Sequence, residues 1–290
     1  MASESIGFIG LGNLGLPMVA NLAERSWRVV VYDSNGDRVA KAVAAGGEAA
    51  AEPSALAACD YLCLAVPDGA VASAVLLDHG LLERLAPTAT VLVHSTVLPG
   101  VAIDLAARCA ERGIAFLDAP VSGGAGRARS GELTAMVGAT AEHLERGRPV
   151  LDAEANEIVH VGRPGAGSAV KLANQLMLFS ALAGAYEAMS LAQAYGVSED
   201  QVLNAIGSGT GASWATDNWG FYDKLSADYD EAAVPAEHRP WSKDLLDVVR
   251  AAADQQLAAP LAALLSGVLP VAVQQHAEQA RGSQVVQSGR

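Results

Sequence analysis

Short apolar runs alternate with segments of mixed polarity through the first half of the chain. One run begins at Ile6 and a second covers residues 29–33. Five more occupy residues 61–66, 91–94, 115–117, 134–137 and 158–161, and helix-forming stretches lie between them at residues 37–45, 71–77, 101–111 and 141–151. This alternation is typical of an α/β domain with a mostly parallel sheet.

The pattern changes after the glycine-rich segment at residues 162–167. Long alanine- and leucine-rich stretches follow, the first at residues 168–195, and β-branched runs become rare. Ser198 and Gln201 have the spacing of a capping box, and residues 241–256 and 260–275 predict two more helices. We therefore expect an α/β domain at residues 1–163 and an all-helical domain at residues 164–290, joined by a long helix.

The first predicted turn carries a glycine motif. Gly10, Gly12 and Gly15 follow a strand and precede a helix, which is the placement of a dinucleotide-binding turn. The phosphates of a bound nucleotide would meet the positive end of that helix. Asp33 ends the second strand, where a carboxylate accepts hydrogen bonds from the adenosine ribose. The fold expected for the first domain is thus a Rossmann fold.

Composition excludes several classes of partner. The formal net charge of -13 opposes binding to nucleic acid or to an anionic membrane, and no apolar run is long enough to span a bilayer. No export signal is visible, so a cytoplasmic location is expected. Cys59, Cys63 and Cys109 favour buried, reduced thiols, and the six histidines show no metal-ligand spacing. The apolar helices of the second half predict a homodimer or homotetramer.

Two polar segments lie where ligands bind in open α/β folds. Ser122, Gly123 and Gly124 follow a strand, and their hydroxyl and amides suit a carboxylate. Lys171 and Asn174 lie three residues apart on one face of the long helix, among apolar neighbours. Lys171 is either a surface ammonium or, when partly desolvated, a group suited to proton transfer.

Four motifs now stand in order along the chain: GFIGLGNLG, DAPVSGG, GAGSAVKLANQ and, at residues 243–245, KDL. Together they resemble the signatures of the β-hydroxyacid dehydrogenases, the family of 3-hydroxyisobutyrate dehydrogenase and tartronate semialdehyde reductase. The resemblance implies reversible hydride transfer between a nicotinamide cofactor and a small 3-hydroxy acid or its semialdehyde or ketone.

The resemblance also implies roles for individual residues. Lys171 is the expected general acid/base, and the expected substrate-binding residues are Ser122, Gly123, Gly124, Asn174 and Gln175. The expected cofactor-binding residues are Gly10, Gly12, Asn13, Leu14, Gly15, Asp33, Val66, Pro67, Thr96 and Lys243. NAD is favoured because Asp33 repels a 2′-phosphate, while Arg38, one helical turn on, leaves NADP open.

Some positions depart from the family pattern. Gln175 stands where many members have asparagine, and Arg127 and Arg129 lie in a stretch that is small or apolar in relatives. These arginines either reach a second anionic group on the substrate or are solvated. The loop at residues 207–219, with Trp214 and Trp219, either shapes a pocket or contributes its aromatics to the core.

Two other functions remain open at this point. One is an imine or other carbonyl-type reductase on the same scaffold, and Lys171 argues against it because relatives that reduce imines usually replace this lysine. The other is a nucleotide-sensing protein without turnover. Ser122, Lys171 and Lys243 together weigh against a sensor, which needs none of them.

Overall fold

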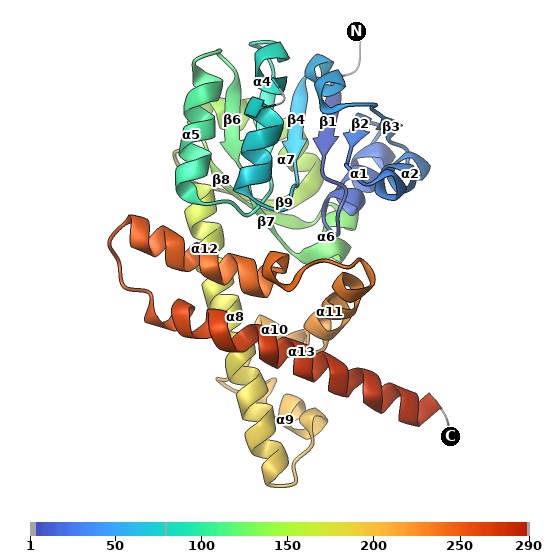
Figure 1. The fold of residues 1–290 in the computed structure, drawn as a ribbon, viewed down its shortest axis with the longest axis vertical. Coiled ribbons are helices and arrows are strands. Elements are labelled where there is room, and N and C mark those ends of the chain that lie inside the picture. Colours follow the sequence, from blue (N-terminus) through green and yellow to red (C-terminus); the bar gives the residue numbers. More distant parts are fainter. Residues whose placement is uncertain (1–3, 79, 289–290) are drawn as a thin grey trace. The chain divides into compact units, whose positions relative to one another are not determined.

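A computed structural model of the chain describes residues 4–78 and 80–288. The chain divides into two compact units, Met1–Lys171 and Leu172–Arg290, so the division falls inside the long helix that the sequence predicts. Helices and strands are labelled in Figure 1. Among the described residues, no helix combines the length and apolar character that crossing a membrane requires.

The first unit is built on one sheet. Its strands are β1 (Ser5–Ile9), β2 (Arg28–Tyr32), β3 (Glu48–Ala49), β4 (Tyr61–Leu64), β5 (Thr90–Val93), β6 (Ala115–Asp118), β7 (Val121–Ser122), β8 (Leu133–Gly138) and β9 (Ala155–Gly162). They lie in the order β3-β2-β1-β4-β5-β6-β8-β7, with β9 on β8. Only the pairings of β8 with β6 and β7 are antiparallel. The predicted mostly parallel sheet is confirmed.

Helices cover both faces of this sheet (Figure 1). The helices of the unit are α1 (Gly15–Glu24), α2 (Gly36–Ala44), α3 (Gly69–Ser73), α4 (Leu81–Arg84), α5 (Pro99–Ala110), α6 (Gly124–Ser130), α7 (Ala141–Glu154) and the start of α8 (Ala166–Ala194). The stretch predicted at residues 71–77 is α3 followed by a π-helical turn, Ala74–Asp78.

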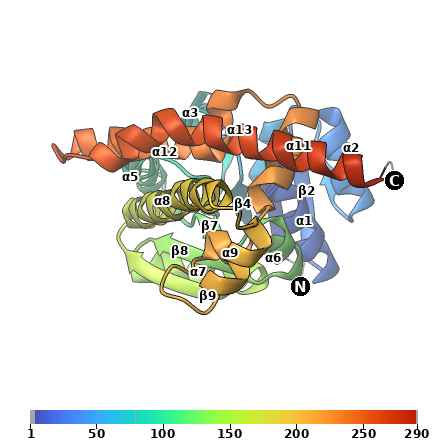
Figure 2. The same cartoon turned by 90° about the horizontal axis from the view of Figure 1, so that it is seen from below.

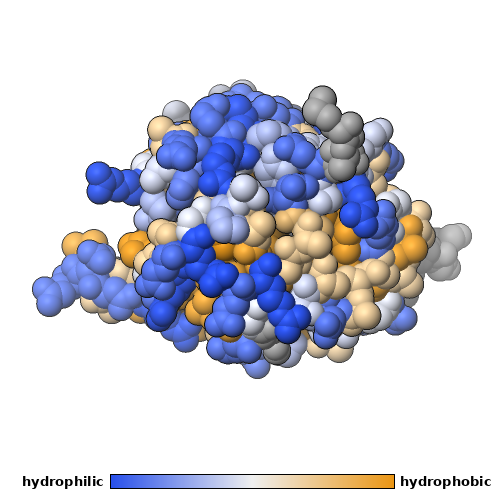
Figure 3. All heavy atoms as spheres, turned by 90° about the horizontal axis from the view of Figure 1, so that it is seen from above, coloured by the Kyte–Doolittle hydropathy of each residue, from blue (hydrophilic) through white to orange (hydrophobic). Residues whose placement is uncertain are grey.

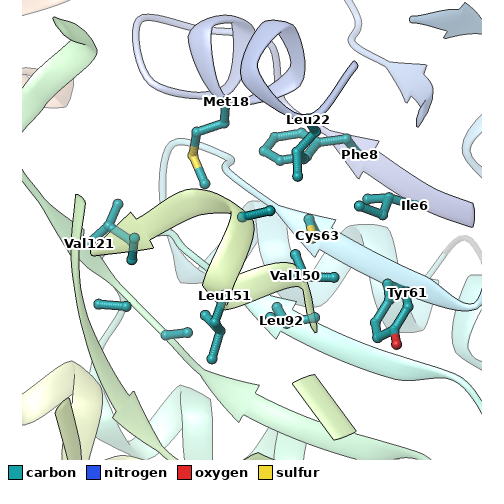
Figure 4. Packing of buried hydrophobic residues seen from close by; sticks show 14 of the residues in the cluster. Ile6, Phe8, Met18, Leu22, Tyr61, Cys63, Leu92, Val121, Val150 and Leu151 are labelled. Atoms are coloured by element: carbon teal, nitrogen blue, oxygen red, sulfur yellow. The ribbon is translucent and has the colours of Figure 1, made fainter. Parts of the chain in front are cut away.

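Two apolar cores hold the helices to the sheet, because side chains alternate between its faces. On one face Phe8 and Cys63 pack with Met18 of α1 and Leu151 of α7 (Figure 4). On the other face Leu62, Leu64, Val91 and Val93 pack with α4 and α5. The strands are buried from both sides, which explains why they read as continuous apolar runs.

The second unit is helical. It contains the remainder of α8, then α9 (Glu199–Ile206), α10 (Trp214–Asp217), α11 (Phe221–Glu231), α12 (Pro240–Asp254) and α13 (Pro260–Ser288). Figure 2 shows α13 running beside α12 and α11, with which it packs. The capping box predicted from Ser198 and Gln201 is present at the start of α9. Phe179, Trp241 and Leu269 lie in the core of this unit.

Candidate active site

Three glycines shape the turn after β1, namely Gly10, Gly12 and Gly15, and each has a different role. A Cβ at Gly10 would collide with the Ala65 carbonyl oxygen, and one at Gly15 would collide with the Gly10 carbonyl oxygen. Nothing lies within 4 Å of a Cβ built at Gly12. Gly10 and Gly15 therefore allow the tight turn and the close start of α1, whereas Gly12 leaves open space where a ligand's phosphates can approach the backbone.

Asp33, at the end of β2, braces this turn. Its carboxylate accepts hydrogen bonds from the amide of Leu11, at 2.7 Å, and from that of Asn35, at 2.8 Å. Arg38 lies 3.8 Å from the same carboxylate, and the Asp33 side chain is only 7% exposed. A carboxylate oxygen that already accepts one amide still has a lone pair for a ribose hydroxyl.

The strand order reverses at β1, beside this turn, because β2 lies on one side of β1 and β4 on the other. Ligands of open α/β sheets bind at such a switch point, at the carboxyl ends of the strands. Val66 and Pro67 lie two and three residues after the end of β4, and Thr96 lies three residues after the end of β5. The Ser95 hydroxyl accepts the Val66 amide at 2.8 Å, so the ends of β4 and β5 are tied together.

Asp118, the last residue of β6, anchors the beginning of α8. Its two carboxylate oxygens accept the amides of Gly165, at 2.9 Å, and Ser168, at 2.8 Å. Burial raises the pKa of Asp118 to about 6, although these hydrogen bonds favour its charged form. The acid thus satisfies backbone donors that the first turn of a helix leaves without partners.

Two glycines bring α8 against the sheet. A Cβ at Gly167 would lie 2.5 Å from the Asp118 carbonyl oxygen and 2.8 Å from the Gly138 amide nitrogen. A Cβ at Gly138 would in turn lie 2.7 Å from the Gly167 amide nitrogen. Backbone meets backbone here, and only residues without a side chain permit it.

Lys171 lies one turn after the anchored start of α8 and is buried. Strands β1, β4, β5 and β6 are all parallel, so their carboxyl ends meet at one edge of the sheet. Because Asp118 fixes α8 at the end of β6, Lys171 lies at the same edge as the glycine turn of β1. A lysine held there is close to where a nucleotide on this sheet would bind.

The Ser122–Gly124 segment lies just past β6. Ser122 pairs with Thr134 of β8 and is partly exposed, and the φ angles of Gly123 and Gly124 are 136° and 73°. Positive φ angles at two successive residues turn the backbone sharply before α6, a conformation that glycine adopts readily. A partly exposed hydroxyl followed by such a turn offers donors suited to a carboxylate.

The arginines of α6 have partners of their own. Arg129 makes a two-pronged contact with Glu24 of α1, and Arg127 donates to Asn156 at 3.3 Å. Both side chains are exposed, and neither arrangement requires a substrate to explain the arginine.

In the second unit, Asp244 joins three of the residues that the sequence singles out. Its carboxylate accepts from Gln175, at 2.6 Å, and from Lys243, at 3.1 Å, while Asn174 donates to the Gln175 side-chain oxygen at 3.1 Å. Lys243 also donates to Asp247 at 2.8 Å. Burial opposes the charge of Lys243, but both acids outweigh it, so its pKa is raised above the ordinary lysine value.

The segment at residues 207–219, expected as a loop, contains the short helix α10, and Trp219 after it belongs to an aromatic cluster of the second unit. Its ring lies 5.4 Å from Tyr186 and 5.0 Å from His276, and its indole donates to Glu199 at 3.0 Å. His276 also contacts Asp223 at 2.7 Å. Trp214 is 43% exposed and packs edge-on against Phe221, at 5.2 Å.

The predicted site residues therefore fall into two groups. The first unit brings the glycine turn, Asp33, Val66, Pro67, Thr96, Ser122–Gly124 and Lys171 to one edge of its sheet, and the second unit links Asn174, Gln175 and Lys243. Asp118 and Asp244 were missed as site residues. The signal for Asp118 was an acid at the end of an apolar strand, and the signal for Asp244 was its place beside Lys243 on a helix.

Models of known protein families match both parts of the chain. Residues 5–162 match the NAD binding domain of 6-phosphogluconate dehydrogenase, and residues 165–288 match the NAD-binding domain of NADP-dependent 3-hydroxyisobutyrate dehydrogenase. An uncharacterized oxidoreductase of Mycobacterium tuberculosis is 40% identical over 193 residues, 66% of this chain. The match spans 65% of that relative's length.

Two further proteins carry more specific names. The NAD-dependent L-serine dehydrogenase of Pseudomonas aeruginosa is 38% identical over 214 residues, which cover 73% of this chain and 72% of that protein. The structure of 3-hydroxyisobutyrate dehydrogenase from Mycobacterium tuberculosis with L-serine superposes with a TM-score of 0.80 at 30% identity, covering 95% of both chains. The chain thus belongs to the β-hydroxyacid dehydrogenase family, the family of 3-hydroxyisobutyrate dehydrogenase.

Proposed function

We propose that this protein is an oxidoreductase that transfers hydride reversibly between a nicotinamide cofactor and a small 3-hydroxy acid. One observation carries the proposal: the Asp118 anchor holds Lys171 at the sheet edge that bears the dinucleotide turn. The cofactor supplies the hydride chemistry. The chain's task is to place the substrate oxygen near an ammonium and to hold the rest of the substrate still.

Lys171 acts as the general acid/base in this proposal. When a carbonyl is reduced, negative charge develops on its oxygen, and a positioned ammonium stabilises that charge and donates a proton. In the oxidative direction the amine accepts the proton of the alcohol. Ser122, Gly123 and Gly124 bind the substrate carboxylate, and Asn174 and Gln175 orient the substrate.

The substrate class follows from this division of roles. A carboxylate held on one segment and a hydroxyl at the lysine define an acid with its reactive oxygen a short distance from the carboxyl group. Relatives named for L-serine and 3-hydroxyisobutyrate, both 3-hydroxy acids, support this class. Lysine at position 171 also favours this reaction over imine reduction.

Turnover by purified protein tests the proposal. We expect NAD-dependent oxidation of 3-hydroxy acids, with L-serine and 3-hydroxyisobutyrate in the panel and 2-hydroxy acids of equal size as poor substrates. Lys171→Ala should lower kcat by about 10²–10⁴ while leaving cofactor affinity nearly unchanged. Cofactor binding without turnover on any acid would instead favour a nucleotide sensor, and a normal kcat in the variant would remove the role of Lys171.

For the cofactor, we propose a preference for NAD over NADP. The carboxylate of Asp33 accepts ribose hydroxyls and repels a 2′-phosphate. It also pairs with Arg38, whose guanidinium lies 3.8 Å from one of its oxygens. The kcat/KM with NAD divided by the kcat/KM with NADP measures the preference. Asp33→Ala should reduce that ratio, and a ratio unchanged by the substitution would show that another residue selects the cofactor.

We also propose that the helical unit mediates self-association into a homodimer or homotetramer. Exposed apolar side chains form a row along one face of α13: Leu261, Leu264, Val268 and Val271. Figure 3 shows one face of the molecule, on which orange hydrophobic residues reach the surface among blue hydrophilic ones. Such exposed rows usually mark contacts. Light scattering should give a dimer or tetramer that Leu264→Asp dissociates, whereas Leu191→Asp, at an exposed leucine of α8, should not.

A further inference from the structure

Three potential metal ligands from distant parts of the sequence meet inside the first unit. Cys63 lies on β4, His94 directly follows β5, and Glu154 ends α7. Their donor atoms lie within 4.8 Å of one another, and all three residues are buried. Among the side chains that the structure describes, this is the only group of three or more such residues whose donor atoms lie this close together. Figure 4 shows Cys63 among the apolar side chains of this core.

The polar atoms of this group are not satisfied by the surrounding protein. His94 Nε2 and both carboxylate oxygens of Glu154 are buried and have no hydrogen-bond partner. Nε2 and Oε2 lie 3.3 Å apart. Buried polar atoms are nearly always hydrogen-bonded, and a ligand bound between His94 and Glu154 would supply the missing partners.

The orientation of His94 is fixed from its other side. Its Nδ1 lies 3.0 Å from the Ala119 carbonyl oxygen. A carbonyl oxygen can only accept, so Nδ1 carries the hydrogen and Nε2 presents a lone pair toward Glu154 and Cys63. A carbonyl that holds the outer nitrogen of a histidine is the usual support of a metal-binding imidazole. The imidazole also stacks on Phe8, with ring centres 6.3 Å apart.

We propose that Cys63, His94 and Glu154 form a structural site for one divalent transition metal ion, with zinc as the occupant. The Cys63 sulfur, His94 Nε2 and the Glu154 carboxylate are three ligands of the types that zinc binds in proteins. Sulfur and nitrogen donors select against Mg²⁺ and Ca²⁺.

Charge and distance agree with this occupant. A thiolate and a carboxylate balance the two positive charges of the ion, so the occupied site is neutral within an apolar core. Donor atoms around tetrahedral zinc lie about 3.6 Å apart. The donor atoms of the group all lie within 4.8 Å of one another, and His94 Nε2 and Glu154 Oε2 lie 3.3 Å apart.

Burial disfavours a charge on both Glu154 and His94. Burial raises the pKa of Glu154 to about 8 and lowers that of His94 to about 4. A cation bound between them would offset the cost of burying a charged carboxylate. The site would join β4, the residue after β5 and α7, and none of its three residues is among those assigned to hydride transfer or cofactor binding.

Metal content tests the proposal directly. The full chain is produced in medium supplemented with Zn²⁺ or with Co²⁺, because a closed site is filled during folding. It is purified without a metal-affinity resin, so that no metal comes from the resin. We expect about one ion per chain, as in other closed zinc sites. The cobalt form should show visible absorption and a thiolate-to-cobalt charge-transfer band, which report sulfur coordination.

Three variants separate this site from adventitious binding. Cys63→Ala and Glu154→Gln should each lose most of the bound metal, and Cys63→Ala should lose the charge-transfer band. Glu154→Gln preserves the volume of the side chain, so it serves if Cys63→Ala does not fold. Cys109→Ala removes another fully buried cysteine and should keep the full metal content. Wild-type protein with less than about 0.1 ion per chain, or equal content in Cys63→Ala, would overturn the proposal.

Discussion

The two units hold their functional residues in different ways. In the first unit, backbone geometry does most of the positioning: glycines allow the turn after β1, and Asp33 and Asp118 hold main-chain amides. In the second unit, side chains position one another, as Asp244 does for Gln175 and Lys243. Backbone positioning fails abruptly when one atom is added, whereas a side-chain network loses its function in steps.

The largest effect should come from adding a methyl group to the first unit's turn. Gly15→Ala places a Cβ against the Gly10 carbonyl oxygen and 3.1 Å from the Phe8 ring. We expect a loss of stability on the order of 4 kcal/mol and no measurable cofactor binding. Thermal unfolding and cofactor titration measure both.

Gly12→Ala is the matched control, because its Cβ would meet nothing within 4 Å. It should unfold at the wild-type temperature while binding cofactor more weakly. Equal unfolding temperatures for the two variants would show that the turn is not held by backbone contacts.

Removing the Asp118 carboxylate should have the next largest effect. Asp118→Ala leaves the buried amides of Gly165 and Ser168 without acceptors, which costs about 2–3 kcal/mol. Turnover should fall with it, since the anchor of Lys171 is lost. Asp104→Ala, which breaks an exposed pair with Arg108, should change stability by less than about 0.5 kcal/mol. An Asp118→Ala protein with wild-type stability would contradict the anchor.

A smaller effect is expected in the second unit. Asp244→Asn keeps a hydrogen-bonding side chain but removes a charge beside Lys243, which Asp247 still accompanies. We expect the pKa of Lys243 to fall and stability to drop by about 1–2 kcal/mol. Asp228→Asn, at an exposed position of α11, is the control. A loss as large as that of Gly15→Ala would erase the contrast between the units.

The smallest effect should come from the titration of His276. Burial opposes its protonation, but Asp223 and Glu199 outweigh burial and raise its pKa above the ordinary histidine value. Its contribution to stability is therefore complete below the pKa of an unfolded histidine and is lost as pH rises through the folded value.

The difference in unfolding temperature between wild type and His276→Gln should accordingly shrink as pH rises above neutrality. His238→Gln, at an exposed histidine, is the control for loss of an imidazole. A difference that grows with pH would reverse the sign assigned to this cluster.

Features that depend on local backbone geometry could be predicted from the sequence, whereas features that depend on contacts between distant residues could not. The turn at Gly10 and Gly15 was predictable because glycine, strand and helix signals lie within ten residues of one another. The division inside α8 has no local signal in the sequence, because helix propensity runs unbroken past Lys171. The Asp118 anchor and the Asp244 network were missed, since each depends on a hydrogen bond between residues at least 47 positions apart.

The cysteines and histidines show most clearly how much the sequence alone could predict. Cys59, Cys63 and Cys109 are buried and unpaired, as the sequence indicates. That Cys63 faces His94 and Glu154 was beyond prediction, because sheet order and helix packing bring together three residues that share no spacing pattern.

The close approach of Gly138 and Gly167 bears on efforts to redesign the enzyme. Neither residue needs to touch a ligand, yet any side chain at either position would push the helix that carries Lys171 away from the sheet. Libraries that aim to broaden the range of accepted acids should therefore diversify the neighbourhood of Ser122 and leave this pair invariant. A saturation screen would register both positions as intolerant, and that intolerance would be steric in origin.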